Sequence, residues 1–156
     1  MSKLSGIRVV DLSLFLPGPM MTSMLADHGA EIIKIEPPGG DPARQMEPFE
    51  EGQSVWFRNI NRGKQSVVLD LKQKDNLQKL YGLVEESDIF VEAFRPGVAN
   101  RLEIDYETLS AINPRIIYCS ISAFGQDGPL AHHPAHDLAV EAFAGFMSVN
   151  DKGDGE

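Results

Sequence analysis

Three histidines and an aspartate near the C-terminal end of the sequence are the residues most suited to proton transfer. His132, His133 and His136 lie in one short stretch, and Asp137 follows immediately. Imidazole titrates near neutral pH, and a nearby carboxylate can orient it as a general base. The side chains of adjacent residues rarely face one another, however, and an aspartate ahead of a helix is also a common N-cap. The sequence is therefore consistent with a base at His136, or with a capped helix that leaves His136 exposed.

The same histidines do not indicate a metal site. His132 and His133 are adjacent, whereas two histidines that bind one metal from a helix are four residues apart. The remaining histidine, His28, is distant in the sequence, and Cys119 is the single cysteine. One cysteine excludes an internal disulfide and a cysteine-based zinc site, and its apolar surroundings are typical of a small buried residue rather than a nucleophile. No metal is predicted.

A cluster of cations stands out in this acidic chain. Arg58, Arg62 and Lys64 lie together in the segment RNINRGK. Such a cluster is consistent with a phosphate contact, and equally with a turn whose charges are solvated. Both interpretations stay open on sequence alone.

The glycine motifs of nucleotide-binding loops are missing from the sequence. The first loop, LPGPM, contains no G-x-G-x-x-G pattern, and a Walker A sequence occurs nowhere. Pro19 also removes a backbone donor that would otherwise face a pyrophosphate. Although Glu36 stands where nicotinamide enzymes place a ribose-binding carboxylate, that class is not predicted without the glycines. A G-x-S-x-G elbow is absent as well, which argues against a serine hydrolase of that type.

Apolar, β-rich runs alternate with helical segments along the chain. Strands are predicted at residues 7–12, 31–36, 66–71, 88–94 and 116–121, and helices at 20–28, 72–86, 98–102, 106–112 and 137–146. Residues 39–61 lack periodicity and are expected to form a long surface loop. The run at 116–121 is apolar and largely β-branched, which predicts a central strand covered on both faces.

This alternation predicts an α/β fold with an open, mainly parallel sheet and helices on both faces. In such sheets, ligands meet the carboxyl ends of the strands. The loops expected there carry four cations: Arg44, Lys72, Arg95 and Arg101. We therefore expect this edge of the sheet to bind an elongated anion.

Length, charge and hydropathy narrow the possible partners and location. The 156 residues, 42% of them hydrophobic and 24% charged, are enough for one globular domain. A net charge of −9 argues against general attraction to nucleic acid or anionic lipid. The apolar run at 138–149 is too short to cross a bilayer, and no secretory signal is recognisable. With one cysteine, these features predict a cytoplasmic protein that acts away from membranes.

Several segments, in the same order, resemble the N-terminal part of family III CoA-transferases, the group of carnitine CoA-transferases, formyl-CoA transferases and α-methylacyl-CoA racemases. They are DLSLFLPGPMMTSMLADHGAEIIKIEPPGGDPAR, NRGKQSVVLDLK, EAFRPGVANRLEIDYETLSAINPRIIYCSISAFGQDGP and AHDLAVEAFAGFMS. The resemblance runs from about Leu4 to Ser148. It implies a Rossmann-like large domain that binds coenzyme A (CoA), within a homodimer of interlocked rings that acts on an acyl-CoA and a carboxylic acid.

The resemblance also implies which residues contact CoA. Leu16 and Pro17 match the adenine-side loop, Arg101 matches a phosphate partner, and the acyl end matches a stretch that begins at Ser122. The full set of predicted CoA-binding residues is Leu16, Pro17, Asp70, Leu71, Lys72, Phe94, Arg95, Arg101, Ser122, Ala123, Phe124 and Gly125. The cations of this set can then be explained as phosphate contacts, because CoA carries a pyrophosphate and a ribose phosphate.

In the transferases of this family, an aspartate attacks the thioester. That aspartate is expected beyond Glu156, and Asp151 and Asp154 do not match its motif. In the racemases the position of His136 is a base, but Ala135 stands where racemases usually have glycine, which favours a transferase. Residues 1–149 are therefore expected to be the CoA-binding part of a large domain that is incomplete relative to the family, with 150–156 a polar tail or truncation point.

Such a chain is predicted to be inactive alone, and to need a second copy or a complementing C-terminal chain. Two alternatives remain open: an α-methylacyl-CoA racemase, and a non-catalytic CoA-binding or assembly fragment.

Overall fold

The computed structural model describes residues 2–147, which divide into two compact units with a boundary between Ser122 and Ala123. The first unit contains β1 (Arg8–Asp11), α1 (Pro17–Asp27), β2 (Glu31–Glu36), η1 (Pro42–Gln45), β3 (Phe49–Glu50), β4 (Gln53–Ser54), α2 (Val55–Ile60), β5 (Gln65–Val68), α3 (Lys74–Glu85), β6 (Ile89–Glu92), α4 (Val98–Arg101), α5 (Tyr106–Ile112) and β7 (Ile117–Ser120). The second contains α6 (Asp137–Phe143). The predicted tail at 150–156 lies outside the described residues.

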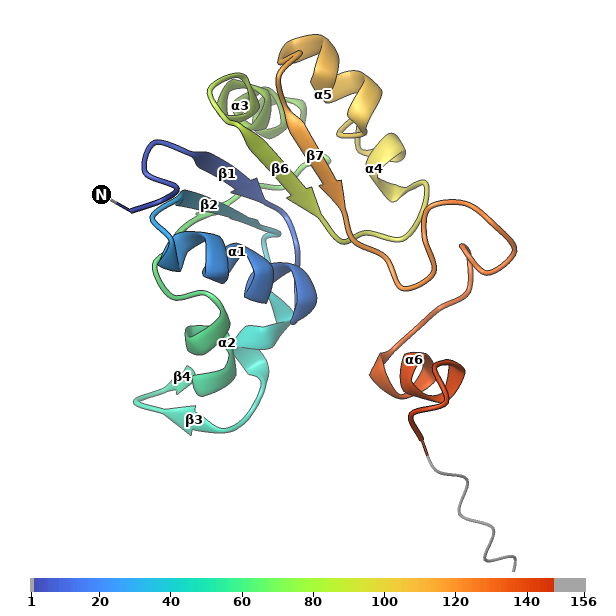
Figure 1. Cartoon of the computed structure of the whole chain (residues 1–156). Coiled ribbons are helices and arrows are strands. Elements are labelled where there is room, and N and C mark those ends of the chain that lie inside the picture. The colour runs from blue at the N-terminus through green and yellow to red at the C-terminus, as the bar shows by residue number, and fades with distance from the viewer. Residues whose placement is uncertain (1, 148–156) are drawn as a thin grey trace, which may run out of the picture. The chain divides into compact units, whose positions relative to one another are not determined.

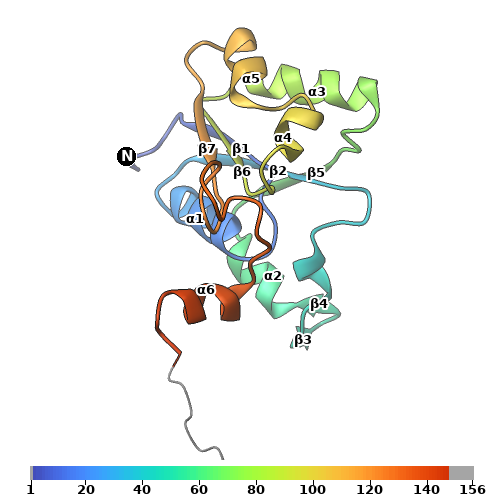
Figure 2. The same cartoon turned by 90° about the vertical axis from the view of Figure 1, so that its right-hand side faces the viewer.

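A five-stranded parallel sheet, in the order β5-β2-β1-β6-β7, organises the first unit. Alternate residues of β1 face opposite ways, so that Val9 and Val10, both fully buried, belong to separate apolar clusters. Val9 packs in the cluster that includes Met21 and Leu25 of α1, whereas Val10 packs with Leu80 of α3. Figure 1 and Figure 2 show α1 on one face and α3 and α5 on the other. The predicted α/β architecture is therefore confirmed.

The prediction of a central strand at 116–121 is wrong for the described residues. β7 lies at the edge of the sheet beyond β6, and although Ile116 is buried, Ile117 is 61% exposed. Apolar, β-branched residues favour an extended strand wherever it lies. The position of a strand in the sheet depends on the crossover connections, which the local sequence does not specify.

Residues 39–61 are also more ordered than predicted. They form η1, the β3–β4 hairpin and α2. Asp41 caps η1 by accepting a hydrogen bond from Ala43 N at 2.9 Å, and Ser54 caps α2 by accepting one from Phe57 N at 3.2 Å. These elements are too short to produce a recognisable hydrophobic period, so only their capping residues mark them in the sequence.

Candidate functional site

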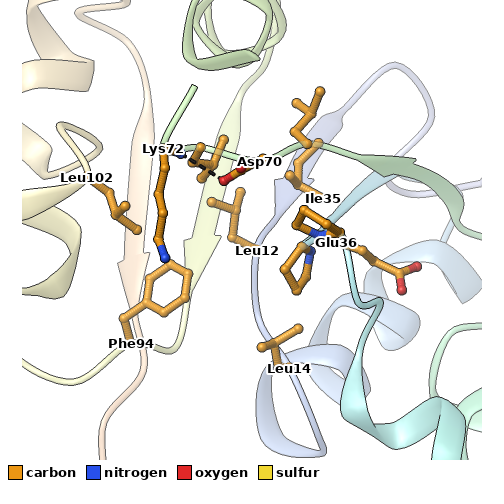
Figure 3. A pocket seen from close by; sticks show the side chains of 12 residues that line it. Leu12, Leu14, Ile35, Glu36, Asp70, Lys72, Phe94 and Leu102 are labelled. Carbon is orange, nitrogen blue, oxygen red and sulfur yellow. Dashed lines mark hydrogen bonds between the residues drawn. The ribbon is translucent and has the colours of Figure 1, made fainter. Parts of the chain in front are cut away.

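A pocket of about 200 Å³ opens at the carboxyl ends of β1, β2, β5 and β6. Figure 3 shows this strand-end pocket from close by. Its lining consists of Leu12, Leu14, Ile35, Glu36, Pro37, Pro38, Leu69, Asp70, Leu71, Lys72, Phe94 and Leu102. Because pockets for whole drug-sized ligands span ~300–1,000 Å³, this one suits a ring-sized part of a larger ligand.

The walls of the pocket are mainly apolar, and Lys72 is the one cation in its lining. Pro37 and Pro38 end β2, since proline cannot donate to a strand ladder. The turn after β5 is held by Asp70, whose Oδ1 accepts a hydrogen bond from Lys72 N at 3.1 Å. Figure 3 shows the side chain of Lys72 extended toward the ring of Phe94. An apolar slot with an amine at its edge fits a flat ring attached to an anionic group.

Glu36 lines the pocket, but its carboxylate is bound elsewhere. Arg44 donates to it from Nε and Nη2, each at 2.7 Å, and Ser66 Oγ and Asp41 N donate at 2.5 and 2.8 Å. Burial alone would raise the pKa of Glu36, but these hydrogen bonds outweigh it and lower the pKa to about 2. The guanidinium of Arg44 also lies 3.8 Å from the centre of the Phe57 ring. Arg44 is thus engaged within the protein, contrary to the expectation that it serves an external anion.

The structure brings together some of the predicted CoA-binding residues. Asp70, Leu71, Lys72 and Phe94 line the pocket, whereas Leu16 and Pro17 are exposed at the start of α1 and do not line it. Leu14, from the same loop as Leu16, is in the lining. The other lining residues, which were not among the predicted CoA-binding residues, are Leu12, Leu14, Ile35, Glu36, Pro37, Pro38, Leu69 and Leu102. Most of them end a strand or follow one, as expected where ligands meet strand ends.

Three cations near the pocket lack a carboxylate partner. Arg101 ends α4 directly before Leu102 of the lining, and Arg95 precedes α4. Within residues 2–147, neither arginine forms an ion pair, and Lys72 forms none either; all three are exposed. Their charges are available to an anionic ligand.

The cations of the RNINRGK segment are used within the protein. Arg58 pairs with Glu50 and Arg62 pairs with Asp27, all at the surface. The side chain of Lys64 is only 2% exposed and lies 3.2 Å from Asp11 Oδ2. A solvated turn describes the two arginines but is wrong for Lys64, and no member of this segment lines the strand-end pocket.

The family model of CoA-transferase family III matches residues 4–156. The chain belongs to this family. It is 48% identical over 151 residues to acetyl-CoA:oxalate CoA-transferase of Acetobacter aceti, covering 96% of this chain and 39% of that protein. It is 41% identical to succinate–glutarate CoA-transferase of Agrobacterium fabrum, covering 98% and 40%. The chain therefore spans about two fifths of the length of these relatives.

Solved structures agree with this family assignment. Rv3272 from Mycobacterium tuberculosis matches with a TM-score of 0.89 and 37% identity, over 99% of this chain and 44% of that one. A CAIB/BAIF family protein from Brucella suis matches with a TM-score of 0.90 and 37% identity, over 99% and 42%. The expected resemblance to the N-terminal part of family III CoA-transferases is confirmed.

No helix within residues 2–147 is long and apolar enough to cross a membrane.

The last four predicted CoA-binding residues of this family III chain lie next to the boundary between the two units. Ser122 is the last residue of the first unit, and the second begins with Ala123, Phe124 and Gly125. The ring of Phe124 packs edge-on against Phe143, with centroids 5.4 Å apart. The expected contact of residues 122–125 with the acyl end of CoA stays a prediction.

The histidine cluster lies in the second unit, and all three of its imidazoles are exposed. His136 is the N-cap residue of α6 without a capping bond from its side chain, and Asp137 is the first helical residue. The alternative that made Asp137 the N-cap is therefore wrong by one residue. His136 is exposed, as that alternative expected. Among residues 2–147, no group of three or more potential ligands could hold a metal ion.

Gly18 allows the first turn of α1 to approach the loop after β1 in this family III chain. A Cβ at this position would lie 2.1 Å from Ser13 Cβ. We expect Gly18→Ala to lower the free energy of unfolding by about 1–3 kcal/mol through overpacking, measured by urea denaturation. Gly82→Ala in α3 is the control, because nothing lies within 4 Å of the new Cβ, and it should be neutral or slightly stabilising. Equal stability of the two variants would contradict the close packing at Gly18.

Proposed function

We propose that this chain binds the nucleotide part of CoA thioesters and forms the N-terminal, CoA-binding portion of a transferase that moves CoA between carboxylic acids. The observation that carries the proposal is the strand-end pocket, where the family-matched residues Asp70, Leu71, Lys72 and Phe94 meet at one edge of a parallel sheet. Both relatives described above are named as CoA-transferases, which supports the same class of reaction.

In this proposal the adenine ring enters the apolar slot and packs against Phe94. Prolines and leucines form the rest of the wall, and the volume of about 200 Å³ suits a ring rather than the whole cofactor. Lys72, Arg95 and Arg101 contact the phosphates, because their charges have no carboxylate partner within residues 2–147. We also propose, from the family resemblance, that Ser122, Ala123, Phe124 and Gly125 contact the acyl end of the thioester.

The proposed chemistry requires a carboxylate nucleophile, which we place outside residues 1–156. An aspartate attacks the thioester carbonyl and forms a mixed anhydride as the CoA thiolate leaves. The thiolate attacks the aspartyl carbonyl, releases the donor acid and forms an aspartyl-CoA thioester. The acceptor carboxylate then attacks that thioester, expels the thiolate and forms a second mixed anhydride. The thiolate attacks the acceptor's carbonyl in this anhydride, which forms the product thioester and releases the aspartate. No net proton or electron is needed.

Completion of the acyl site would then come from further polypeptide, either a second copy of the chain or a complementing C-terminal chain. This arrangement predicts CoA binding by the 156 residues without turnover. The racemase alternative predicts instead that an exposed base at His136 exchanges the α-proton of an acyl-CoA once the site is complete.

Calorimetric titration of the chain with acetyl-CoA and with adenosine 3′,5′-bisphosphate tests this proposal. We expect both to bind, since both contain the adenine and the ribose phosphate. Phe94→Ala should weaken each by about 1–3 kcal/mol, the usual value of one base–aromatic contact. Phe49→Ala is the matched control, because Phe49 is an exposed aromatic residue of β3 outside the pocket. Absence of heat with both compounds, or equal affinities for the Phe94 and Phe49 variants, would refute the proposed site.

A turnover assay separates the possible reactions. Transfer of CoA from acetyl-CoA to oxalate, the substrates in the name of the Acetobacter relative, is the first pair to try. The proposal predicts no transfer by this chain alone. Uptake of deuterium at the α-carbon of 2-methylacyl-CoA, without transfer, would support the racemase.

A further inference from the structure

Four buried charged side chains belong to the strands that end at the strand-end pocket or to segments beside them, and none of the four lines it. They are Asp11, Lys34, Asp41 and Lys64, each with a side chain at most 2% exposed. We call this group the loop-locking network. Ionised groups are costly to bury, and well-packed apolar residues often replace such pairs without loss of stability. A stabilising role alone therefore does not account for four of them in one place.

One half of the network connects the loop after β1 to the loop after β2. Lys34 Nζ donates a hydrogen bond to Ser13 O, in the loop after β1, at 2.7 Å. It also lies 2.9 Å from Asp41 Oδ2, in the loop after β2, with which it forms an ion pair. Asp41 Oδ1 accepts hydrogen bonds from Ala43 N at 2.9 Å and from Phe15 N at 3.3 Å. Both loops contribute to the pocket, one through Leu14 and the other through two prolines.

The other half connects the first turn of α1 to the segment between α2 and β5. Asp11 Oδ1 accepts from Ser13 N at 2.9 Å, and Asp11 Oδ2 accepts from Thr22 Oγ1 at 2.5 Å and from Lys64 Nζ at 3.2 Å. Lys64 Nζ also donates to Pro19 O at 2.8 Å and to Asn61 Oδ1 at 2.9 Å. The loop that bears Leu14 is thus held at both ends.

The backbone of this loop is strained at its centre. Phe15 has φ of 64°, in the left-handed region that non-glycine residues rarely occupy. Such a conformation costs ~1–3 kcal/mol and persists only where the surroundings impose it. The hydrogen bond from Phe15 N to Asp41 is one of the contacts that impose it.

We propose that Asp11, Lys34, Asp41 and Lys64 are positioning residues that fix the loops at 12–19 and 37–45 in the conformation that forms the pocket for the CoA nucleotide. The proposal rests on the proposed function for the identity of the ligand. It assigns these four residues no contact with the ligand. Their effect on binding passes through Leu14, Pro37 and Pro38.

The network gives binding a pH dependence through Lys64. The pKa of Lys64 is lowered to about 8, chiefly by burial and to a lesser extent by the nearby Lys34, whereas Asp11 and Asp41 oppose the shift. Above this pH the amine becomes neutral and its ion pair with Asp11 is lost. We therefore expect the loop to loosen and the affinity for acetyl-CoA to fall as the pH rises from 7 to 9.

The contribution of Lys64 to the free energy of unfolding changes with pH in the opposite direction to the expected affinity for acetyl-CoA. The pKa of Lys64 is lower in the folded protein than the ordinary lysine value of 10.5. Between about pH 8 and 10.5 the unfolded chain therefore binds more protons, and the contribution of Lys64 to the free energy of unfolding rises with pH. Weaker binding at pH 9 cannot result from destabilisation by this group.

The test measures acetyl-CoA affinity by calorimetry at pH 7 and 9, and backbone hydrogen exchange at pH 7, in the 156-residue chain. Acetyl-CoA is chosen because it has no free thiol to titrate. For the unmodified chain we expect about fivefold weaker binding at pH 9, the value of one modest hydrogen-bonded ion pair. Lys64→Met should bind weakly at both pH values, without the pH dependence, and should exchange the amides of Phe15 and Ala43 faster.

Two further variants keep the test decisive. Arg62→Met, which removes a neighbouring but exposed ion pair, should leave affinity and exchange unchanged. If Lys64→Met does not fold, Asp11→Asn removes the same ion pair while keeping an acceptor, and should show the same losses. Unchanged exchange at Phe15 and Ala43, together with a pH profile like that of the unmodified chain, would overturn the positioning role. Faster exchange in a protein that binds no acetyl-CoA at all would instead refute the proposed function.

Discussion

Replacing Asp41 by alanine is expected to lower the free energy of unfolding by about 3–5 kcal/mol, because it leaves the ammonium of Lys34 buried without a counter-charge. The side chains of Lys34 and Asp41 are 1% and 0% exposed, so water cannot solvate the remaining charge. The substitution also leaves Phe15 N and Ala43 N without their acceptor. Urea denaturation followed by circular dichroism measures the change.

Two comparisons isolate the charge in this experiment. Asp41→Asn keeps the acceptor for Ala43 N but removes the ion pair, and should be destabilised less than the alanine variant. The double variant Lys34→Met with Asp41→Ala removes both charges, and should recover part of the loss. Glu85→Ala, at an exposed carboxylate in α3, should change stability by no more than about 0.5 kcal/mol. A double variant as unstable as the sum of its single changes would show that the two side chains do not interact.

Replacing Lys72 and Arg101 together by alanine is expected to weaken CoA binding by about 100-fold. Each hydrogen bond to a charged phosphate contributes ~1.5–3 kcal/mol, and the lower end applies because both side chains are exposed. Arg101→Ala alone should account for about half of the lost free energy. Binding of the unmodified chain should also weaken with added salt, and the double variant should show a smaller salt dependence.

Arg115→Ala is the matched control for this pair. Arg115 is also exposed, but it precedes β7 and thus lies at the amino ends of the strands, away from the pocket. Its loss removes the same charge from the protein without touching the proposed site. If the Arg115 variant lost as much affinity as the double variant, the attraction would be a general effect of net charge rather than a phosphate contact.

The sequence predicted those features that local residues determine. The bounds of β2 and α5 were predicted correctly, because Pro37 ends the strand and Asn113-Pro114 ends the helix. Parallel pairing followed from the alternation of strands and helices. The edge position of β7 and the short elements at 39–61 were not predicted, since sheet order and weakly periodic turns depend on contacts distant in the chain.

The candidate site was predicted to a similar degree. Asp70 to Lys72 and Phe94 were identified through the family resemblance, and they do line a pocket. The loop-locking network was missed, because nothing in the sequence pairs Lys64 with Asp11 or Lys34 with Asp41. Such pairs arise only when β1, β2 and the start of β5 are brought side by side.

The bonding of Glu36 keeps this side chain ionised in mild acid. Its pKa of about 2 lies below its ordinary value of 4.5, so the favourable contribution of this group to folding is present above pH 4.5 and is lost only as the pH falls toward 2. Across the mildly acidic and neutral range Glu36 therefore carries the same charge. Any change in nucleotide affinity between pH 5 and 7 must then come from groups other than Glu36, including the ligand's own phosphates, which leaves that interval free for titrating the ligand itself.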